Sequence, residues 1–297
     1  MEKQEIEKIV EAGKIAKQVV EYAKIIVKHN MPLLEIADKI ENKILELKAK
    51  PAFPVNLSIN EIAAHSTPSY NDETKAHGLL KVDIGVHIEG YVADTALSID
   101  LENSEENKNL IKAAENARDK ALEKIKIEIP LRQIGSIIEK TCSEFNVQPI
   151  RNLSGHSISQ YNLHSGLTIP NFDNTQELKI EEGVYAIEPF TTLSSGSSAV
   201  KDGKLSGIYH LEKEGNVRDN FARQVLQYII EEYKTLPFCA RWIHKKFGTR
   251  GLLALRQIES ANLLHHYPQL IEKSGTKVAQ AEHTVLLANK EKIITTK

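Results

Sequence analysis

The chain has 297 residues, 41% of them hydrophobic and 26% charged, which is enough to bury the core of one large domain. A formal net charge of -2 and a pI near 6.6 argue against a protein that binds nucleic acid through its overall charge. Two cysteines, Cys142 and Cys239, are too few for a disulfide framework, and no apolar run reaches the roughly 18 residues that a membrane span needs. We therefore expect a cytoplasmic protein that contacts no membrane.

The first predicted element is a helix within residues 1–20. This stretch is charged throughout, which is not typical of a signal peptide. Its apolar residues recur near helical spacing, at positions 6, 9, 10, 12, 15, 16, 19 and 20. The pattern predicts an amphipathic helix that packs on the core and serves the scaffold.

An internal repeat organises the next two hundred residues. Residues 32–41 (PLLEIADKIE) and 130–139 (PLRQIGSIIE) share Pro, Leu, Ile, Ile and Glu at the same five places, which predicts two helices with proline in the first turn. Each helix leads to a similar strand, at 53–58 and 148–154, and then to a histidine, His65 or His156. The pattern predicts a duplicated α/β unit whose first half runs from about residue 31 to 128.

A β-hairpin is predicted within residues 79–99, where strand-forming residues flank Glu89 and Gly90. Alternation along the first strand would place Val82, Ile84 and Val86 on one face and Asp83 on the other. Asp83 and Asp94 would then meet on adjacent strands.

A second hairpin is predicted from strands that are far apart in the chain. Glu188 lies in GVYAIEPF and Glu282 in VAQAEHTVLL, and 93 residues stand between them. We expect an inserted subdomain over about 191–275, with helices near 217–235, 238–247 and 249–262. Its modest basic cluster with Trp242 (Arg241, Lys245, Lys246, Arg250 and Arg256) leaves nucleic-acid binding open, but a lid or wall beside the active site is the favoured interpretation.

Four acids and one histidine fall in or beside these strands and turns: Asp83, Asp94, His156, Glu188 and Glu282. Any one of the acids alone is typical of a solvated turn. Together, four carboxylates balance the charge of two dications, and the imidazole completes their coordination. The sequence therefore predicts a site for two divalent metal ions, which would be poorly ordered without metal because clustered acids repel.

Five segments carry a family resemblance that covers essentially the whole chain. They are AFPVNLSINEIAAHSTP (52–68), KVDIGVHIEGYVADTA (81–96), NLSGHSISQYNLHSG (152–166), AIEPF (186–190) and QAEHTVLL (280–287). In this order they resemble the type 2 methionine aminopeptidases of peptidase family M24. The resemblance implies an α+β pita-bread, or creatinase-like, fold: one catalytic domain over 1–297, with two pseudo-twofold α/β halves and a winged-helix-like helical insertion.

The resemblance also implies the activity and the roles of residues. It implies a cytoplasmic, monomeric hydrolase that removes the initiator methionine from nascent polypeptides with a small, uncharged second residue, in transient contact with the ribosome and with no specific nucleic acid. Cobalt, manganese, iron and zinc all suit the ligands. Glu188 would be both metal ligand and proton shuttle, His65 catalytic and substrate-binding, and His164, Phe53 and Tyr267 substrate-binding. Leu163 and Tyr209 are weaker candidates for the pocket.

Departures from the family and alternatives follow from the same residues. Ser165 stands where relatives commonly carry alanine, and the long polybasic and acidic extension of eukaryotic type 2 enzymes is absent, which predicts an archaeal form. A prolidase or aminopeptidase P shares the ligand set but usually carries Gly-His-Gly, whereas this chain has Gly155-His156-Ser157. A catalytically inactive binding protein of the same fold is the other alternative, and the presence of all five ligands argues against it.

Overall fold

The computed structural model describes residues 1–297 and contains six helices and sixteen strands. The helices are α1 (Lys3–Ile26), α2 (Leu33–Glu46), α3 (Glu105–Lys124), α4 (Leu131–Glu144), α5 (Asn220–Glu232) and α6 (Ala240–Ser260). The strands of the first half are β1 (Lys50–Pro51), β2 (Asn56–Ile59), β3 (Ile62–Ala64), β4 (Leu79–Ile88) and β5 (Tyr91–Asp100). The later strands are β6 (Val147–Pro149), β7 (Ser154–Ile158), β8 (Thr168–Pro170), β9 (Gly183–Ile187), β10 (Phe190–Leu193), β11 (Val200–Leu211), β12 (Phe238–Cys239), β13 (Leu264–Glu272), β14 (Val278–Gln280), β15 (His283–Ala288) and β16 (Glu291–Ile294).

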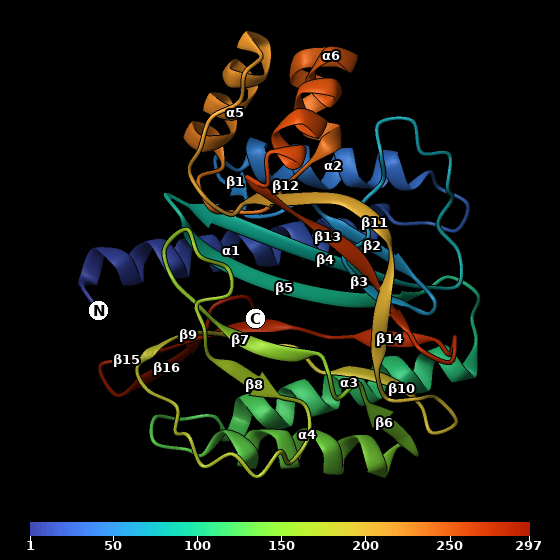
Figure 1. Cartoon of the computed structure of the whole chain (residues 1–297). Helices are drawn as coiled ribbons and strands as arrows, with labels where there is room; N and C mark the ends of the chain where they lie inside the picture. Colours follow the sequence, from blue (N-terminus) through green and yellow to red (C-terminus); the bar gives the residue numbers. More distant parts are fainter.

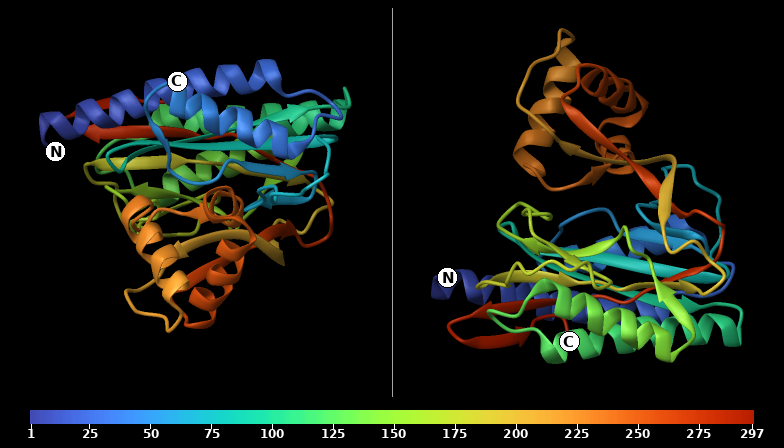
Figure 2. Two further views of the ribbon diagram at one scale, coloured as in Figure 1. Left: turned by 90° about the horizontal axis from the view of Figure 1, so that it is seen from above. Right: turned by 60° about the horizontal axis from the view of Figure 1, so that its bottom comes forward.

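Two halves with matching elements form the body of the molecule, as the internal repeat predicted. Helices α2 and α4 each have 14 residues and begin directly after Pro32 and Pro130. These two prolines form equivalent isolated bridges, with Lys75 and with Lys179. Helices α1 to α4 lie on one side of the sheets and α5 and α6 on the other (Figure 2). The fold is the mixed α/β arrangement that was expected, and none of the six helices combines the length and the apolar character needed to cross a membrane.

The predicted first hairpin is formed by β4 and β5, which run side by side through the middle of the molecule (Figure 1). Glu89 and Gly90 both have positive φ, 49° and 85°, which is the conformation of a two-residue type I′ turn. In the resulting register, Asp94 pairs with Gly85, two residues from Asp83. Both aspartates therefore point to the same face of the sheet.

Burial decides which face this is. Val82, Ile84 and Val86 pack into a hydrophobic cluster with residues of α1 and α2. Because side chains alternate along a strand, Asp83 and Gly85 face the opposite side, away from the helices. The polar site therefore faces the side of the sheet on which the insertion lies.

The second hairpin is completed by residues far apart in the chain. β9 pairs with β15, so that Ile187 lies opposite His283. Glu188 follows the end of β9 and Glu282 precedes the start of β15, which brings the two carboxylates together at one end of the pair. The split hairpin predicted from the sequence is thus present in the fold.

The insertion stands apart from the body and is built on two long strands (Figure 2). β11 and β13 pair along most of their length and carry α5 and α6 above the sheet. The three predicted helices correspond to α5 and to the two parts of α6, which breaks at Gly248, where φ is 64°. The expectation of a purely helical insertion missed the two strands, because residues 200–211 (VKDGKLSGIYHL) lack a regular apolar alternation and contain two glycines.

A buried ion pair fixes the insertion on α2. Arg241 is only 4% exposed and donates to both carboxylate oxygens of Glu41 at 2.7 Å. The indole Nε1 of Trp242 donates to Glu41 at 2.8 Å. Arg241 is therefore not part of an exposed basic patch, and the cluster noted in the sequence loses its first member to a structural contact.

We expect Arg241→Met to destabilise the insertion, because it leaves the Glu41 carboxylate buried without its cation. Breaking one partner of a buried pair typically costs roughly 3–5 kcal/mol. The thermal midpoint should fall and proteolytic cleavage in α5 and α6 should accelerate. The double variant Arg241→Met/Glu41→Gln should recover part of the loss, and the exposed Arg256→Met should behave as wild type. Equal stability of the single variant and the wild type would contradict this role.

Candidate metal and active site

One cavity of about 300 Å³ brings together the expected metal ligands and the main expected substrate residues. It opens between the body and the base of the insertion. Its lining includes the five expected metal ligands and the four expected substrate residues, namely Asp83, Asp94, His156, Glu188, Glu282, Phe53, His65, His164 and Tyr267. Phe53 and Glu282, which are 229 positions apart in the chain, therefore face one space. Its volume is roughly the lower limit for small-ligand pockets.

The five expected ligands lie together in the cavity, with Asp94, His156 and Glu282 buried and with Asp83 and Glu188 partly buried. Ligand atoms of Asp94, His156 and Glu282 all lie within 4.8 Å of one another. The Nε2 atom of His156 is 3.7 Å from Asp94 Oδ2 and 3.5 Å from Glu188 Oε1. Asp83 lies on the same face of the sheet as Asp94, because Asp94 pairs with Gly85, two residues from Asp83. The spacing is that of donor atoms directed at a shared centre.

Burial and mutual repulsion shift the pKa of every acid in the group. Burial raises the pKa of Asp83 to about 7. Burial and the neighbouring Asp83 raise the pKa of Asp94 well above its usual range, and burial and the other acids do the same for Glu188 and Glu282. Burial lowers the pKa of His156 to about 3, so its imidazole is neutral. Acids clustered in this way need compensating positive charge in order to ionise together at neutral pH.

Unpartnered atoms show what kind of charge the group fits. Asp83 Oδ1, Asp94 Oδ1 and Glu282 Oε1 are buried and accept no hydrogen bond from the protein. Buried polar atoms without partners are rare and call for an explanation. A hard or borderline divalent cation accepts electron pairs from carboxylate oxygens and imidazole nitrogen. The donor set therefore fits a metal centre.

Two further histidines stand beside the ligands without joining them. The ring of His164 lies 4.3 Å from that of His156, and the ring of His65 lies 5.1 Å from that of Tyr267. His65 has a positive φ of 57°, which is strained for a residue with a side chain and marks a held conformation. Burial lowers its pKa to about 4, so it is a neutral hydrogen-bonding group at neutral pH.

The apolar part of the cavity is formed by Phe53, Leu163 and Tyr267, with a wall from the insertion. Tyr209 does not line it and lies instead in the core of the insertion, stacked on Phe238. Because β11 alternates, Ile208 points toward the cavity and Tyr209 points away. The suggestion that Tyr209 contributes to the pocket is therefore wrong, and its neighbour Ile208 lines the cavity instead.

Gly85 leaves the space that the Phe53 ring occupies, since a Cβ at this position would overlap that ring. The backbone of Gly85 does not require glycine, so we expect Gly85→Ala to fold and to push the Phe53 ring into the cavity. Overpacking typically costs 1–3 kcal/mol, and KM for a methionyl peptide should rise roughly tenfold with a smaller change in kcat. Steady-state kinetics would test this. The double variant Gly85→Ala/Phe53→Leu should recover part of the affinity, and an unchanged KM in the single variant would contradict the role of Phe53.

Sequence reasoning missed several groups at the site. Gln280 donates from Nε2 to Asp83 Oδ2 at 3.3 Å and so orients this carboxylate. Its position two residues before Glu282, on the same face of the segment, was the available signal. The missed lining residues come from both the body and the insertion and include Asn56, Asn152, Leu153, Phe190, Ile208, Pro237 and Leu270.

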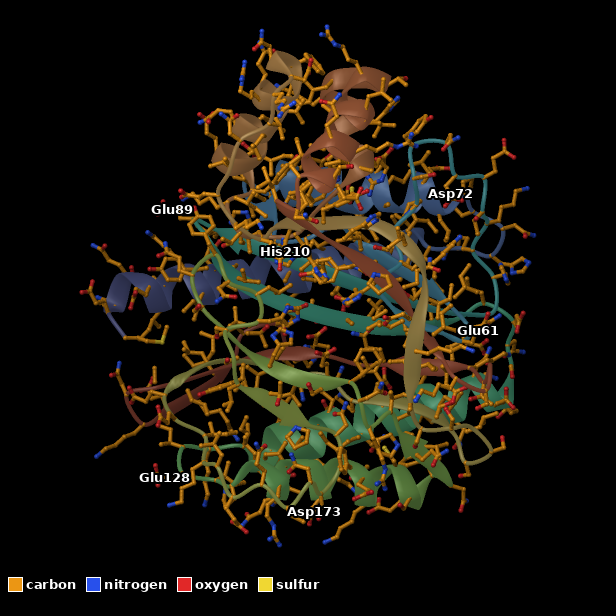
Figure 3. The ribbon with its side chains drawn as sticks, viewed as in Figure 1. Glu61, Asp72, Glu89, Glu128, Asp173 and His210 are labelled. Atoms are coloured by element: carbon orange, nitrogen blue, oxygen red, sulfur yellow. The ribbon has the colours of Figure 1, made fainter.

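A further pair of histidines lies near this site on the insertion. His210 and His265 are opposite each other on β11 and β13, with ring centres 5.2 Å apart. Both rings adjoin Tyr267. Figure 3 shows His210 near the middle of the view, whereas the labelled Asp72, Glu128 and Asp173 lie toward the margins.

Comparison with known proteins agrees with the fold and with the nature of the site. The model of metallopeptidase family M24 matches residues 7–287. The methionine aminopeptidase of Methanocaldococcus jannaschii is 43% identical over 300 residues, which cover 100% of both chains. Among solved structures, a thermophilic Arx1 has a TM-score of 0.83 at 14% identity, covering 99% of this chain and 91% of that one.

The methionine aminopeptidase of Rickettsia prowazekii has a TM-score of 0.72 at 20% identity, covering 100% of this chain and 98% of that one. These two structures share the pita-bread fold with this chain, and at such low identity they establish the fold alone. The full-length sequence match and the family model go further. The chain belongs to metallopeptidase family M24, in the group of the methionine aminopeptidases.

Proposed function

We propose that Asp83, Asp94, His156, Glu188 and Glu282 bind two divalent metal ions, beside a cavity that holds the first residue of a peptide. The chain is a metallo-aminopeptidase that hydrolyses the bond after an N-terminal methionine. The observation that carries the assignment of the site is the buried group of acids, whose unpartnered oxygens lie in one 300 Å³ cavity.

Divalent ions bound there would polarise the scissile carbonyl and lower the pKa of a water molecule toward neutrality. Cobalt, manganese, iron and zinc all suit four carboxylates and one imidazole. The protein contributes the fixed positions of the donors, held by paired strands on both halves of the fold. His156 contributes a neutral nitrogen, because its pKa lies near 3.

Glu188 is the residue placed to move protons. Its carboxyl lies at the end of β9, faces the cavity and has a pKa raised by burial and by the neighbouring acids. A carboxyl group with a raised pKa can take a proton from the attacking water and return it to the leaving amine. His65 and His164, both lining the cavity, would hydrogen bond to the peptide where charge develops.

The methionine side chain would occupy the apolar part of the cavity. Phe53, Leu163 and Tyr267 offer the contacts that suit a flexible thioether. We further propose that the second residue must be small and uncharged, since it would lie against the histidines. A monomer acting in the cytoplasm on nascent chains, in transient contact with ribosomes, is the setting that this substrate implies.

The experiment that tests the proposal compares Met-Ala-Ser, Met-Leu-Ser, Pro-Ala-Ser and the X-Pro peptide Ala-Pro-Ser, with metal-free protein and with added cobalt or manganese. Metal-dependent release of methionine from Met-Ala-Ser alone is the expected result. Cleavage of X-Pro peptides instead would indicate a prolidase or an aminopeptidase P. Metal binding without hydrolysis of any peptide would indicate a binding protein that keeps its ligands.

A further inference from the structure

A second cavity, of about 290 Å³, lies between the body and the insertion and is separate from the active site. Its body side comes from α2, β1 and β4, and its insertion side from α5 and α6. Of its 13 lining residues, six are aromatic or aliphatic and five are charged, and the other two are Asn42 and His87. Nothing in the aminopeptidase reaction uses it.

The charges of this cavity leave a positive excess. Its carboxylates are engaged, Glu232 with Lys50 at 2.7 Å and Glu41 with Arg241 and Trp242. Lys245 and Lys246 form no ion pair, and the Lys246 ammonium lies 5.4 Å from the centre of the Tyr228 ring. Two lysines without counter-charges beside a concave surface favour an anion.

A histidine N–H without a hydrogen-bond partner in the protein also lines this space. His87 is 6% exposed, and its Nδ1 accepts a hydrogen bond from the backbone N–H of Gly90 at 3.0 Å. Since Nδ1 is the acceptor, the proton of the neutral ring is on Nε2. That N–H has no partner in the protein and is available to an acceptor on a ligand.

The remaining lining residues indicate that the ligand also carries a planar ring. Tyr228 and Trp242 present aromatic surface, Tyr233 is stacked on Phe238 and Trp242 beside them, and Leu45 is 54% exposed, a large value for leucine. Aromatic side chains favour stacking with planar rings. The volume is that of a small pocket, suited to a single ring system with its anionic group rather than to a polymer.

From these four features we infer that the cavity between the body and the insertion binds a nucleoside monophosphate. Its phosphate would lie at Lys245 and Lys246, its base against the aromatic residues, and a base or sugar acceptor at His87. The site adjoins the methionine pocket, since Pro51 and Leu236 line this cavity while Phe53 and Pro237 line the other. The inference does not depend on the proposed function, because it concerns binding alone.

Trp242 is the single tryptophan of the chain and lines this cavity, so its fluorescence reports on the site. AMP, adenosine and inorganic phosphate would be titrated into the full-length protein with excitation at the red edge of tryptophan absorption, and calorimetry would follow the same titrations. We expect saturable binding of AMP and much weaker binding of adenosine and of phosphate. Added salt should weaken AMP binding.

The matched variants are Lys245→Gln/Lys246→Gln and Lys213→Gln, an exposed lysine of the insertion outside the cavity. The double variant should bind AMP at least about tenfold more weakly, a change of 1.4 kcal/mol, and Lys213→Gln should bind as wild type does. These lysines are exposed, so folding is not at risk. The inference is overturned if AMP gives neither a fluorescence nor a calorimetric signal, if phosphate binds as tightly as AMP, or if the double variant binds AMP normally.

Discussion

Glu188→Gln should lower kcat by a factor of about 10² to 10⁴, the usual contribution of a positioned acid–base group. The change keeps the shape of the side chain but removes its ability to accept and return a proton. It also replaces one charge of a repelling group, so the metal-free variant should be at least as stable as the metal-free wild type. Steady-state hydrolysis of Met-Ala-Ser and thermal unfolding would be measured on the same samples.

Glu181→Gln is the matched control for this variant. Glu181 is exposed, lies just before β9 and does not line the cavity. Its replacement should leave both kcat and the unfolding temperature unchanged. A Glu188→Gln enzyme that retains activity within tenfold of wild type would remove Glu188 from the acid–base role.

Metal removal should make the protein less stable as pH rises above about 6.5. Between roughly pH 4 and 6.5 two effects oppose each other. The raised pKa of Asp83, about 7, and those of the other three acids give stability that is present at low pH and lost as pH rises. The lowered pKa values of His65 and His156, about 4 and 3, give stability that increases up to their unfolded value near 6.5. Above that value the histidines contribute no further change and the loss from the acids continues. The buried Lys81, whose pKa is lowered by burial, contributes the opposite trend, equally with and without metal.

The measurement is the thermal midpoint of chelator-treated protein from pH 6.5 to 8.5, with and without manganese or cobalt. Metal in hundredfold excess over its dissociation constant should add about 2.7 kcal/mol of stability and reverse the decline. Asp94→Asn should flatten the decline of the metal-free protein and weaken the stabilisation by metal. A metal-free midpoint that declines no more over this range than the metal-loaded midpoint would show that the acids do not repel one another in the fold.

The sequence allowed the candidate site to be predicted well, and particular residues show why. The two-residue turn at Glu89-Gly90 and the alternation of Val82, Ile84 and Val86 determine on which face Asp83 and Asp94 lie. Both signals are local: turn chemistry and strand period depend on residues a few positions apart. The repeated helices after Pro32 and Pro130 were readable for the same reason. The family resemblance then supplied roles that such local reasoning could not assign, such as those of His65 and His164.

Other features were decided only by the tertiary structure. The orientation of Ile208 rather than Tyr209 toward the cavity depends on the register of β11 with β13, which has irregularities that no local pattern announces. Glu41, the partner of Arg241, lies 200 positions earlier in the chain. From its own segment of the sequence, Arg241 cannot be distinguished from an exposed basic residue. The cavity beneath Trp242 exists only because the insertion is held on α2. Such contacts join surfaces whose proximity is determined by the whole packed fold, so their physical cause is not present in any one segment of the sequence.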